Sequence, residues 1–208
     1  LQSNTGPSVY DVSNDNESVR MFDNSFLEFF THVHPVTPLV IFLPVIGYFT
    51  YSAFKNYYLT LPLFLYFFIF GLFVWSFTEY ILHRFAFHIE PTNKIKKYVY
   101  FMIHGVHHDY PNDGTRLVMV PAVSLPLAAL FYYLFEYLLG KNNVAAFFPG
   151  FISGYLVYDM MHYAIHHFSM KGKILASIKK HHFKHHYQSD KKYFGVSSPL
   201  WDYIFRTK

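Results

Sequence analysis

Four long apolar segments dominate the pattern of hydrophobic and polar residues along the chain. They cover residues 35–54, 59–82, 117–139 and 144–161. A helix needs roughly 20 residues to cross a hydrocarbon core about 30 Å thick, and each segment has about that length. The second segment also lacks the polar stripe that a surface helix of a soluble protein carries. The pattern therefore predicts four membrane helices rather than four buried helices of a soluble domain.

Short polar links join these segments in pairs. KNYY separates the first two segments and GKNN the last two, and such short links hold successive helices antiparallel. Several prolines interrupt the apolar segments, where membrane helices tolerate them because neighbouring groups satisfy the freed carbonyls. The sequence thus predicts an all-α integral membrane protein whose four transmembrane helices form two hairpins.

The basic residues predict which ends of the helices face the cytoplasm. The two links carry only Lys55 and Lys141 of the 17 Lys and Arg residues. The others lie before the first segment, between the second and third, and after the fourth. Because positive residues favour the cytoplasmic side, we expect both termini and the central segment there.

This orientation suggests a division of the chain. Residues 1–34 are expected to form a polar lead-in and interfacial segment, and residues 35–208 a membrane domain. Within that domain, residues 83–116 and 162–208 are expected to form a histidine-rich helical cap on the cytoplasmic side.

The composition limits which partners and which metal ligands the chain can have. Hydrophobic residues make up 52% of the chain and charged residues only 14%, against roughly 25% charged in soluble proteins. The net charge of +4 comes from basic residues that flank apolar segments, so we expect a membrane and no nucleic acid as partner. The chain has no cysteine, which excludes disulfides, thiolate-bound haem and cysteine-held iron–sulfur clusters. A bound transition metal must use histidine, carboxylate or water.

Histidine supplies the candidate ligands. Most of the 14 histidines fall into four clusters at the predicted cytoplasmic ends of the segments, HRFAFH, HGVHH, HYAIHH and HHFKHH. Residues three and four apart share one helical face, and neutral imidazole binds Fe, Zn, Cu and Ni. The clusters therefore predict a metal site with ten candidate ligands: His83, His88, His104, His107, His108, His162, His166, His182, His185 and His186. Ten ligands exceed what one ion takes, so we expect two ions with five ligands each, or with five and four.

The pair His83 and His88, and the four histidines outside the ten candidates, differ from the other candidates in their expected positions. His83 and His88 stand about 140° apart on an ideal helix, so both reach one ion only if the backbone between them is irregular. His32 and His34 are expected at the membrane interface, and His167 at the surface or behind the ligands. His181 is expected to lie there too, although it stands four residues before His185 and could replace His182.

Two carboxylates precede ligands on the same helical face. Asp159 lies three residues before His162 and Glu79 four before His83, so each could accept the second N–H of an imidazole. Tyr158 and Tyr163 could line a substrate path, but an aromatic belt at the membrane interface is the preferred expectation. The segment YFGVSSPLWDYIF near the end of the chain is expected to pack beneath the last histidine cluster, without a chemical role.

The four clusters, in this order, resemble the HxxxxH, HxxHH, HxxxH and HxxHH motifs of the membrane fatty acid hydroxylase and sterol desaturase superfamily. The flanking residues in EYILHRFAFH, HGVHHDYPND and YDMMHYAIHH are similar to its fatty acid 2-hydroxylase branch over roughly residues 70–205. The resemblance implies two iron ions and O₂-dependent hydroxylation at C2 of a long fatty acyl chain, free or within a ceramide or sphingolipid. The predicted cytoplasmic side could belong to an endoplasmic reticulum membrane or to a bacterial inner membrane.

The resemblance also implies an electron donor. No HPGG haem motif of a cytochrome b5 domain occurs in these residues. We therefore expect either a separate donor, such as cytochrome b5 or a ferredoxin with its reductase, or a cytochrome b5 domain that lies outside these residues.

Three other functions stay open at this point. A sterol, carotenoid or alkane oxygenase or desaturase would use the same metal site. A membrane metal transporter would hold its ion near the bilayer midplane, which these histidines avoid. A zinc hydrolase would need only about three protein ligands per ion, and zinc found in purified protein would be a substitute for iron.

Overall fold

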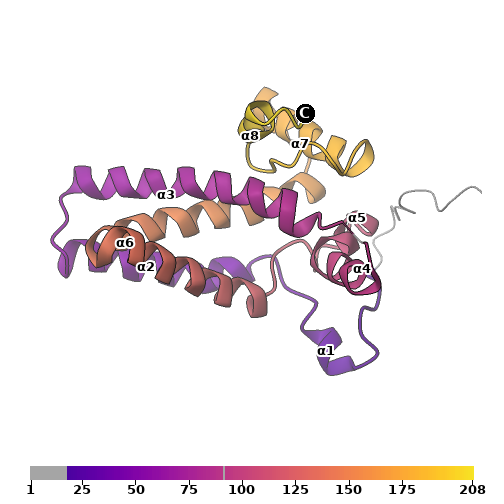
Figure 1. The fold of residues 1–208 in the computed structure, drawn as a ribbon, viewed down its shortest axis with the longest axis horizontal. Coiled ribbons are helices and arrows are strands. Elements are labelled where there is room, and N and C mark those ends of the chain that lie inside the picture. The colour runs from indigo at the N-terminus through magenta and orange to yellow at the C-terminus, as the bar shows by residue number, and fades with distance from the viewer. Residues whose placement is uncertain (1–17, 91) are drawn as a thin grey trace, which may run out of the picture.

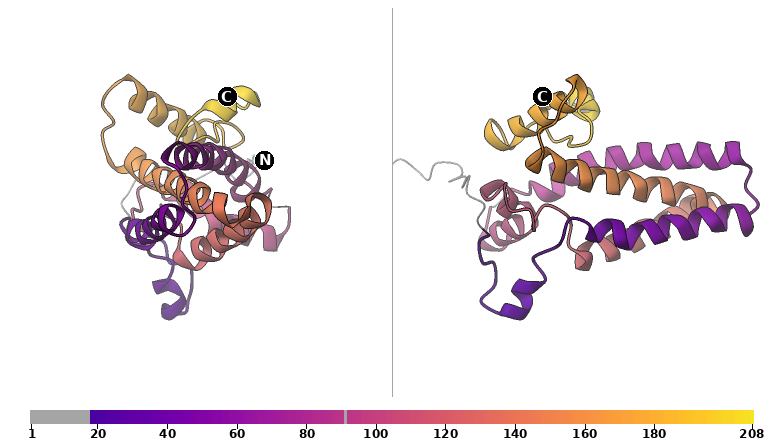
Figure 2. Two further views of the ribbon diagram at one scale, coloured as in Figure 1. Left: turned by 90° about the vertical axis from the view of Figure 1, so that its left-hand side faces the viewer. Right: turned by 180° about the vertical axis from the view of Figure 1, so that it is seen from behind.

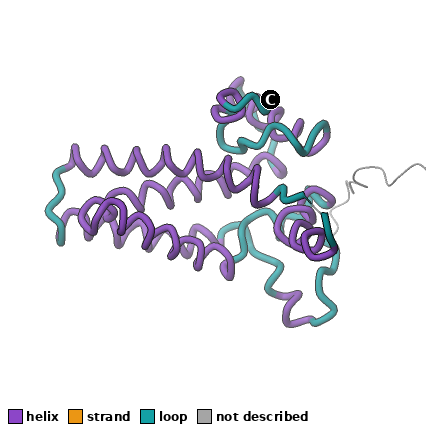
Figure 3. The backbone as a smooth tube through the Cα atoms, in the orientation of Figure 1, coloured by secondary structure: helices purple, strands orange, loops and turns teal. Residues whose placement is uncertain are grey.

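The computed structural model describes residues 18–90 and 92–208, and every regular element in these ranges is helical. Three long helices form a bundle, α2 (Thr37–Lys55), α3 (Leu61–Ile81) and α6 (Pro121–His167) (Figure 1). Short helices gather at one end of it: α1 (Ser25–Phe29), η1 (Leu82–Phe87), α4 (Lys94–Tyr100), η2 (Phe101–Gly105), α5 (Val106–Asp109), α7 (Lys173–Tyr187) and α8 (Leu200–Ile204). Most of the loops lie at that end as well (Figure 3).

Helix α6 folds back on itself at Gly140, whose φ of 77° and ψ of 161° are not helical. The two arms then lie side by side, with the rings of Phe135 and Phe147 4.7 Å apart (Figure 2). Glycine suits this turn because a side chain at positive φ is strained. The predicted link GKNN is therefore a turn at one residue rather than a loop. Residues 117–120, predicted as helix, precede Pro121, which begins the helix at a position that favours proline.

Three helices are long and apolar enough to cross a membrane, with mean hydropathies of 1.5, 1.9 and 1.6. Much of their apolar surface faces outward, including Tyr66, Ile69 and Phe73 of α3. So large an exposed apolar area is unfavourable in water and is the surface expected against lipid. The structure thus agrees with an all-α membrane protein.

Close packing of α3 against α6 positions the histidine clusters. A Cβ atom at Gly71 would lie 2.2 Å from the Phe147 carbonyl oxygen, and one at Gly150 2.0 Å from that of Phe68. Only glycine permits this approach of the two backbones. Trp75 then packs edge to face on Phe151 near the middle of the interface. As a result, the last turns of both helices end next to each other.

The predicted irregular backbone between His83 and His88 is confirmed. The segment Leu82–Phe87 is a π-helix, in which the His88 N–H donates to the His83 carbonyl at 3.2 Å. Residues five apart share a face in this geometry, and the two rings stand 5.1 Å apart.

The N-terminal strap, residues 18–33, is more ordered than a polar lead-in would be. Its α1 helix begins at Ser25 with Asn24 as cap, and Val33 donates its N–H to the Thr115 carbonyl at 2.8 Å. Residues 1–17 of the predicted lead-in lie outside the described residues.

Candidate metal centre

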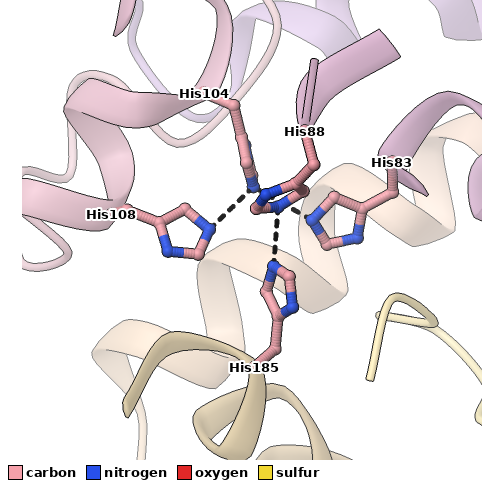
Figure 4. A group of neighbouring side chains, drawn as sticks. All are labelled: His83, His88, His104, His108 and His185. Atoms are coloured by element: carbon pink, nitrogen blue, oxygen red, sulfur yellow. Dashed lines mark hydrogen bonds between the residues drawn. The ribbon is translucent and has the colours of Figure 1, made fainter. Parts of the chain in front are cut away.

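The structure brings all ten candidate histidines together in two groups of five. Within each group, one ring nitrogen per residue lies within 4.8 Å of the others. The first group consists of His83, His88, His104, His108 and His185 (Figure 4). The second group consists of His107, His162, His166, His182 and His186.

Each HxxHH motif is divided between the two groups. His104 and His108, four apart, enter the first group, whereas His107 between them enters the second. The last cluster divides the other way: His182 and His186 enter the second group and His185 the first. In each motif, the first and last histidines are four residues apart and belong to one group. The middle histidine belongs to the other group.

The ring nitrogens have the spacing of metal ligands. In the first group, Nε2 of His104 lies 3.0 Å from Nε2 of His83 and 3.1 Å from Nε2 of His108. In the second, the Nε2 atoms of His107 and His162 are 2.9 Å apart. Two ligands at right angles on an ion with bonds of about 2.1 Å would be about 3 Å apart.

Two rings of the first group carry their hydrogen on Nδ1, which leaves Nε2 free to bind a metal ion. Nδ1 of His83 donates to the Phe194 carbonyl, and Nδ1 of His185 donates to the Lys192 carbonyl at 2.7 Å. A carbonyl only accepts, so these neutral rings carry their hydrogen on Nδ1 and have a bare lone pair on Nε2. Each bare Nε2 faces another ring nitrogen at about 3 Å, His83 facing His104 and His185 facing His88, and two ligands of one cation have the same spacing. The donor set therefore fits transition metals that prefer imidazole.

Burial keeps the candidate ligands neutral. Burial, reinforced by repulsion from His83, lowers the pKa of His88 to about 2. Burial, with repulsion from His88, lowers the pKa of His185 to about 3. Burial likewise holds the pKa of His107 well below its ordinary value. Desolvation disfavours the imidazolium, so the lone pairs are available to bind metal at neutral pH.

Two buried carboxylates hold the loop that supports the first group. Glu79 accepts the backbone N–H groups of Val196 and Ser197, each at 2.8 Å. Asp202 accepts those of Phe194 at 2.9 Å and Gly195 at 2.7 Å. The predicted contact of Glu79 with the His83 ring is thus replaced by an indirect one. Glu79 anchors the loop whose Phe194 carbonyl holds that ring.

Sequence reasoning missed Asp202 and assigned its segment only a packing role. The carboxylate is fully buried and also accepts from Thr207 at 2.7 Å. Burial by itself raises the pKa of Asp202, but hydrogen bonds from His181, Thr207 and the loop backbone outweigh burial and lower it. A single carboxylate within the aromatic stretch PLWDYIF is the signal that could have revealed it, because a buried charge requires several donors.

The other histidines lie outside both groups. Nε2 of His181 lies 2.9 Å from Asp202 Oδ2, which leaves His182 as the member of the second group. His167 stacks on Tyr163 with ring centroids 4.5 Å apart. In the strap, Nδ1 of His32 lies 2.7 Å from the Thr115 hydroxyl. Just after the strap, Nδ1 of His34 accepts the nearby N–H of Val36 at 3.2 Å.

The hydrogen bond predicted between Asp159 and His162 does not form. The Asp159 carboxylate is buried and makes no hydrogen bond to a ligand ring in the described part of the chain. The Tyr155 hydroxyl and the Met119 backbone lie beside it instead. Tyr158, expected in an interfacial belt, is buried. Both Asp159 and Tyr158 line a cavity next to the histidines.

This cavity has a volume of about 390 Å³ and joins the histidines to the apolar interior of the cap. His104, His107 and His162 border it on one side. Apolar residues from the strap, η2 and the start of α6 form most of the remaining wall, among them Met21, Leu27, Phe30, Met102, Ile103, Val120 and Val123. An apolar cavity with few polar groups is typical of a site for an apolar ligand.

Fold and site together define an all-helical protein with helices apolar enough to cross a membrane and two polyhistidine groups beside an apolar cavity. Residues 68–207 match the family model described as fatty acid hydroxylase. The chain belongs to this family.

The chain is also similar to individual proteins that are named as fatty acid hydroxylases. The chain is 33% identical to fatty acid 2-hydroxylase of Rattus norvegicus, over 91% of this chain and 56% of the relative. It is 35% identical to dihydroceramide fatty acyl 2-hydroxylase FAH1 of Arabidopsis thaliana, over 92% and 80%. The chain therefore spans little more than half the length of the rat relative.

A solved structure described as full-length scs7p with only the hydroxylase domain visible has the same fold. Its TM-score is 0.83 at 38% identity, over 89% of this chain and 70% of that one.

Proposed function

We propose that this chain is an O₂-dependent monooxygenase that hydroxylates C2 of a long-chain fatty acyl group, either a free fatty acid or the acyl chain of a ceramide or sphingolipid. The observation that carries the proposal is the contact of an apolar cavity with histidines of both groups, His104 from the first and His107 from the second. The relatives named as fatty acid and dihydroceramide fatty acyl 2-hydroxylases support the choice of substrate.

The ten grouped histidines would hold two iron ions, five ligands to each. Iron supplies the change of oxidation state that activation of O₂ requires, which zinc cannot supply. The chain's own residues hold the neutral rings in place and bury them, so that water is kept from the site. Zinc bound to purified protein would occupy the same nitrogens as a substitute.

The cavity would bind the acyl chain and bring the carbons next to its carboxyl end to the histidines. Apolar side chains such as Met102 and Val120 would contact the methylene groups. Asp159 and Tyr158 provide the polar wall nearest to His162, where the head of the substrate would lie. This arrangement favours attack close to the head group, as a C2 product requires.

We further propose that the bundle crosses the membrane four times, with the two arms of α6 as separate crossings. The cap, 83–116 and 162–208, and the interfacial segment 1–34 would then face the cytoplasm, at the endoplasmic reticulum or a bacterial inner membrane. The distribution of Lys and Arg supports this orientation.

A separate electron donor, such as cytochrome b5 or a ferredoxin with its reductase, would complete the reaction. Insertion of one oxygen atom from O₂ reduces the other to water and consumes a pair of electrons. The histidine groups do not supply these electrons, so they must arrive at the cap from outside.

The competing functions are less well supported. A transport site would lie near the bilayer midplane, whereas the two groups lie where α3 and α6 end. A zinc hydrolase would leave most of the ten buried histidines without a role. A sterol, carotenoid or alkane oxygenase stays compatible with the metal groups and differs in the substrate.

Lipid analysis tests the proposal. Cells that produce the chain should accumulate 2-hydroxy acyl chains in their free fatty acids or sphingolipids, as measured by mass spectrometry. Cells that produce a His107→Ala, His108→Ala variant should not. Hydroxylated sterols or alkanes without 2-hydroxy acyl products would contradict the proposed substrate.

A further inference from the structure

The two histidine groups differ in how their rings are supported from outside. In the first group, His83 and His185 each donate Nδ1–H to a backbone carbonyl of one loop. In the second group, the Leu117 backbone lies beside the His162 ring, but the Nδ1 atoms of His107, His182 and His186 have no hydrogen-bond partner within the described residues. The anchored and the unanchored rings are buried alike, so exposure does not explain the difference.

The supporting loop, residues 192–197, is itself held by buried groups on several sides. Glu79 and Asp202 together accept the four consecutive backbone N–H groups of residues 194–197. Asp202 also accepts from the Thr207 hydroxyl, which lies 3.0 Å from the Tyr80 hydroxyl of α3. At Gly195 a Cβ atom would lie 2.1 Å from the Ser198 carbonyl, so the loop has room only for glycine there. The Phe194 carbonyl is therefore fixed against α3.

We infer that the first group retains its metal ion more firmly than the second, and that Glu79 and Asp202 produce the difference as positioning residues. The inference rests on the proposed two-metal function. A carbonyl partner fixes the tautomer and orientation of an imidazole and makes it a more basic ligand. Rings without such a partner must lose conformational freedom when an ion binds, which weakens binding. Neither carboxylate belongs to a histidine group or lines the cavity.

Metal release from the full-length protein tests this inference. The purified protein, loaded with Zn²⁺ as a redox-silent probe, would be challenged with excess EDTA, and the zinc retained per chain measured over time. We expect a fast phase and a slow phase of equal amplitude. His166→Ala should abolish the fast phase, and His88→Ala the slow one, because these residues belong to different groups.

Variants of the two carboxylates then test the cause. Asp202→Asn and Glu79→Gln should each accelerate the slow phase by about tenfold, the usual effect of losing an outer hydrogen-bond partner, and leave the fast phase unchanged. Glu136→Gln is the matched control. It lies four residues before the Gly140 turn, which about 33 Å of helix separates from His162, and should change neither phase.

Results that contradict this inference differ from results that contradict the proposed two-metal function. A single release rate in the wild-type protein, or equal acceleration of both phases by the carboxylate variants, would overturn the inference. If Asp202→Asn fails to fold, Glu79→Gln and the two histidine variants still test whether the buried carboxylates slow metal release from the first group. Binding of fewer than two zinc ions by the wild-type protein would instead contradict the proposed two-metal function.

Discussion

At the scale of single residues, the spacing of the histidines predicted the ten residues that come together, because i, i+3 and i, i+4 positions share a helical face whatever the fold. Two sites of five ligands were also expected, but which histidine joins which group was not predictable. Whether His107 or His108 reaches a given group depends on where α6 and α7 lie, and no local pattern encodes that. Asp202 escaped notice for the same reason, since its partners come from α7, an irregular loop and the end of the chain.

Asp159 provides a prediction at this scale. Asp159→Asn should lower hydroxylase activity by at least tenfold and leave the metal content unchanged, because the carboxylate lines the cavity without bonding to a ligand ring. Product formation and metal analysis of the same preparation measure the two effects. Loss of metal in parallel with activity would show that Asp159 supports the ligands instead.

At the scale of elements, hydropathy located the apolar helices to within a few residues. It could not show that the third and fourth segments continue helically up to one glycine, because a turn at positive φ depends on a single residue. It also gave no indication that the strap forms part of the cavity wall. That contact joins residues about 90 positions apart, such as Glu28 and Arg116.

Glycine at the contact of α3 with α6 provides a second prediction. Gly150→Ala should destabilise the protein by about 1–3 kcal/mol, the usual effect of overpacking, because the added methyl group meets the Phe68 backbone. Thermal unfolding in detergent measures it. Gly47→Ala is the control: nothing lies within 4 Å of its Cβ position on α2, so it should be neutral or stabilising.

The strap provides a third prediction. Arg116 is buried and donates to Glu28 at 2.6 Å, to Thr31 at 3.2 Å and to the Val19 carbonyl. Arg116→Met should therefore release the strap, speed its cleavage by protease and lower activity without loss of metal. Arg20→Met removes only bonds within the strap itself and should have a much smaller effect. Equal protease sensitivity of the two variants would contradict this account of Arg116.

At the scale of the whole molecule, the charge pattern predicts which end of the helix bundle faces the cytoplasm. The absence of cysteine makes it directly measurable, because single cysteines can be introduced without a background. Lys55→Cys and Lys141→Cys, both exposed, should be labelled from the side opposite the cytoplasm. Lys180→Cys on α7 should be labelled only from the cytoplasmic side. Labelling of all three from one side would exclude the proposed four crossings.

The central claim is that the two groups of histidines hold two iron ions beside the cavity. The most direct test is the identity and number of metal ions in full-length protein purified without oxygen, measured by elemental mass spectrometry. We predict about two irons per chain, falling to about one when a single group is disrupted by His88→Ala or His166→Ala. One ion or none in the wild-type protein, or hydroxylase activity in protein that contains only zinc, would contradict the claim.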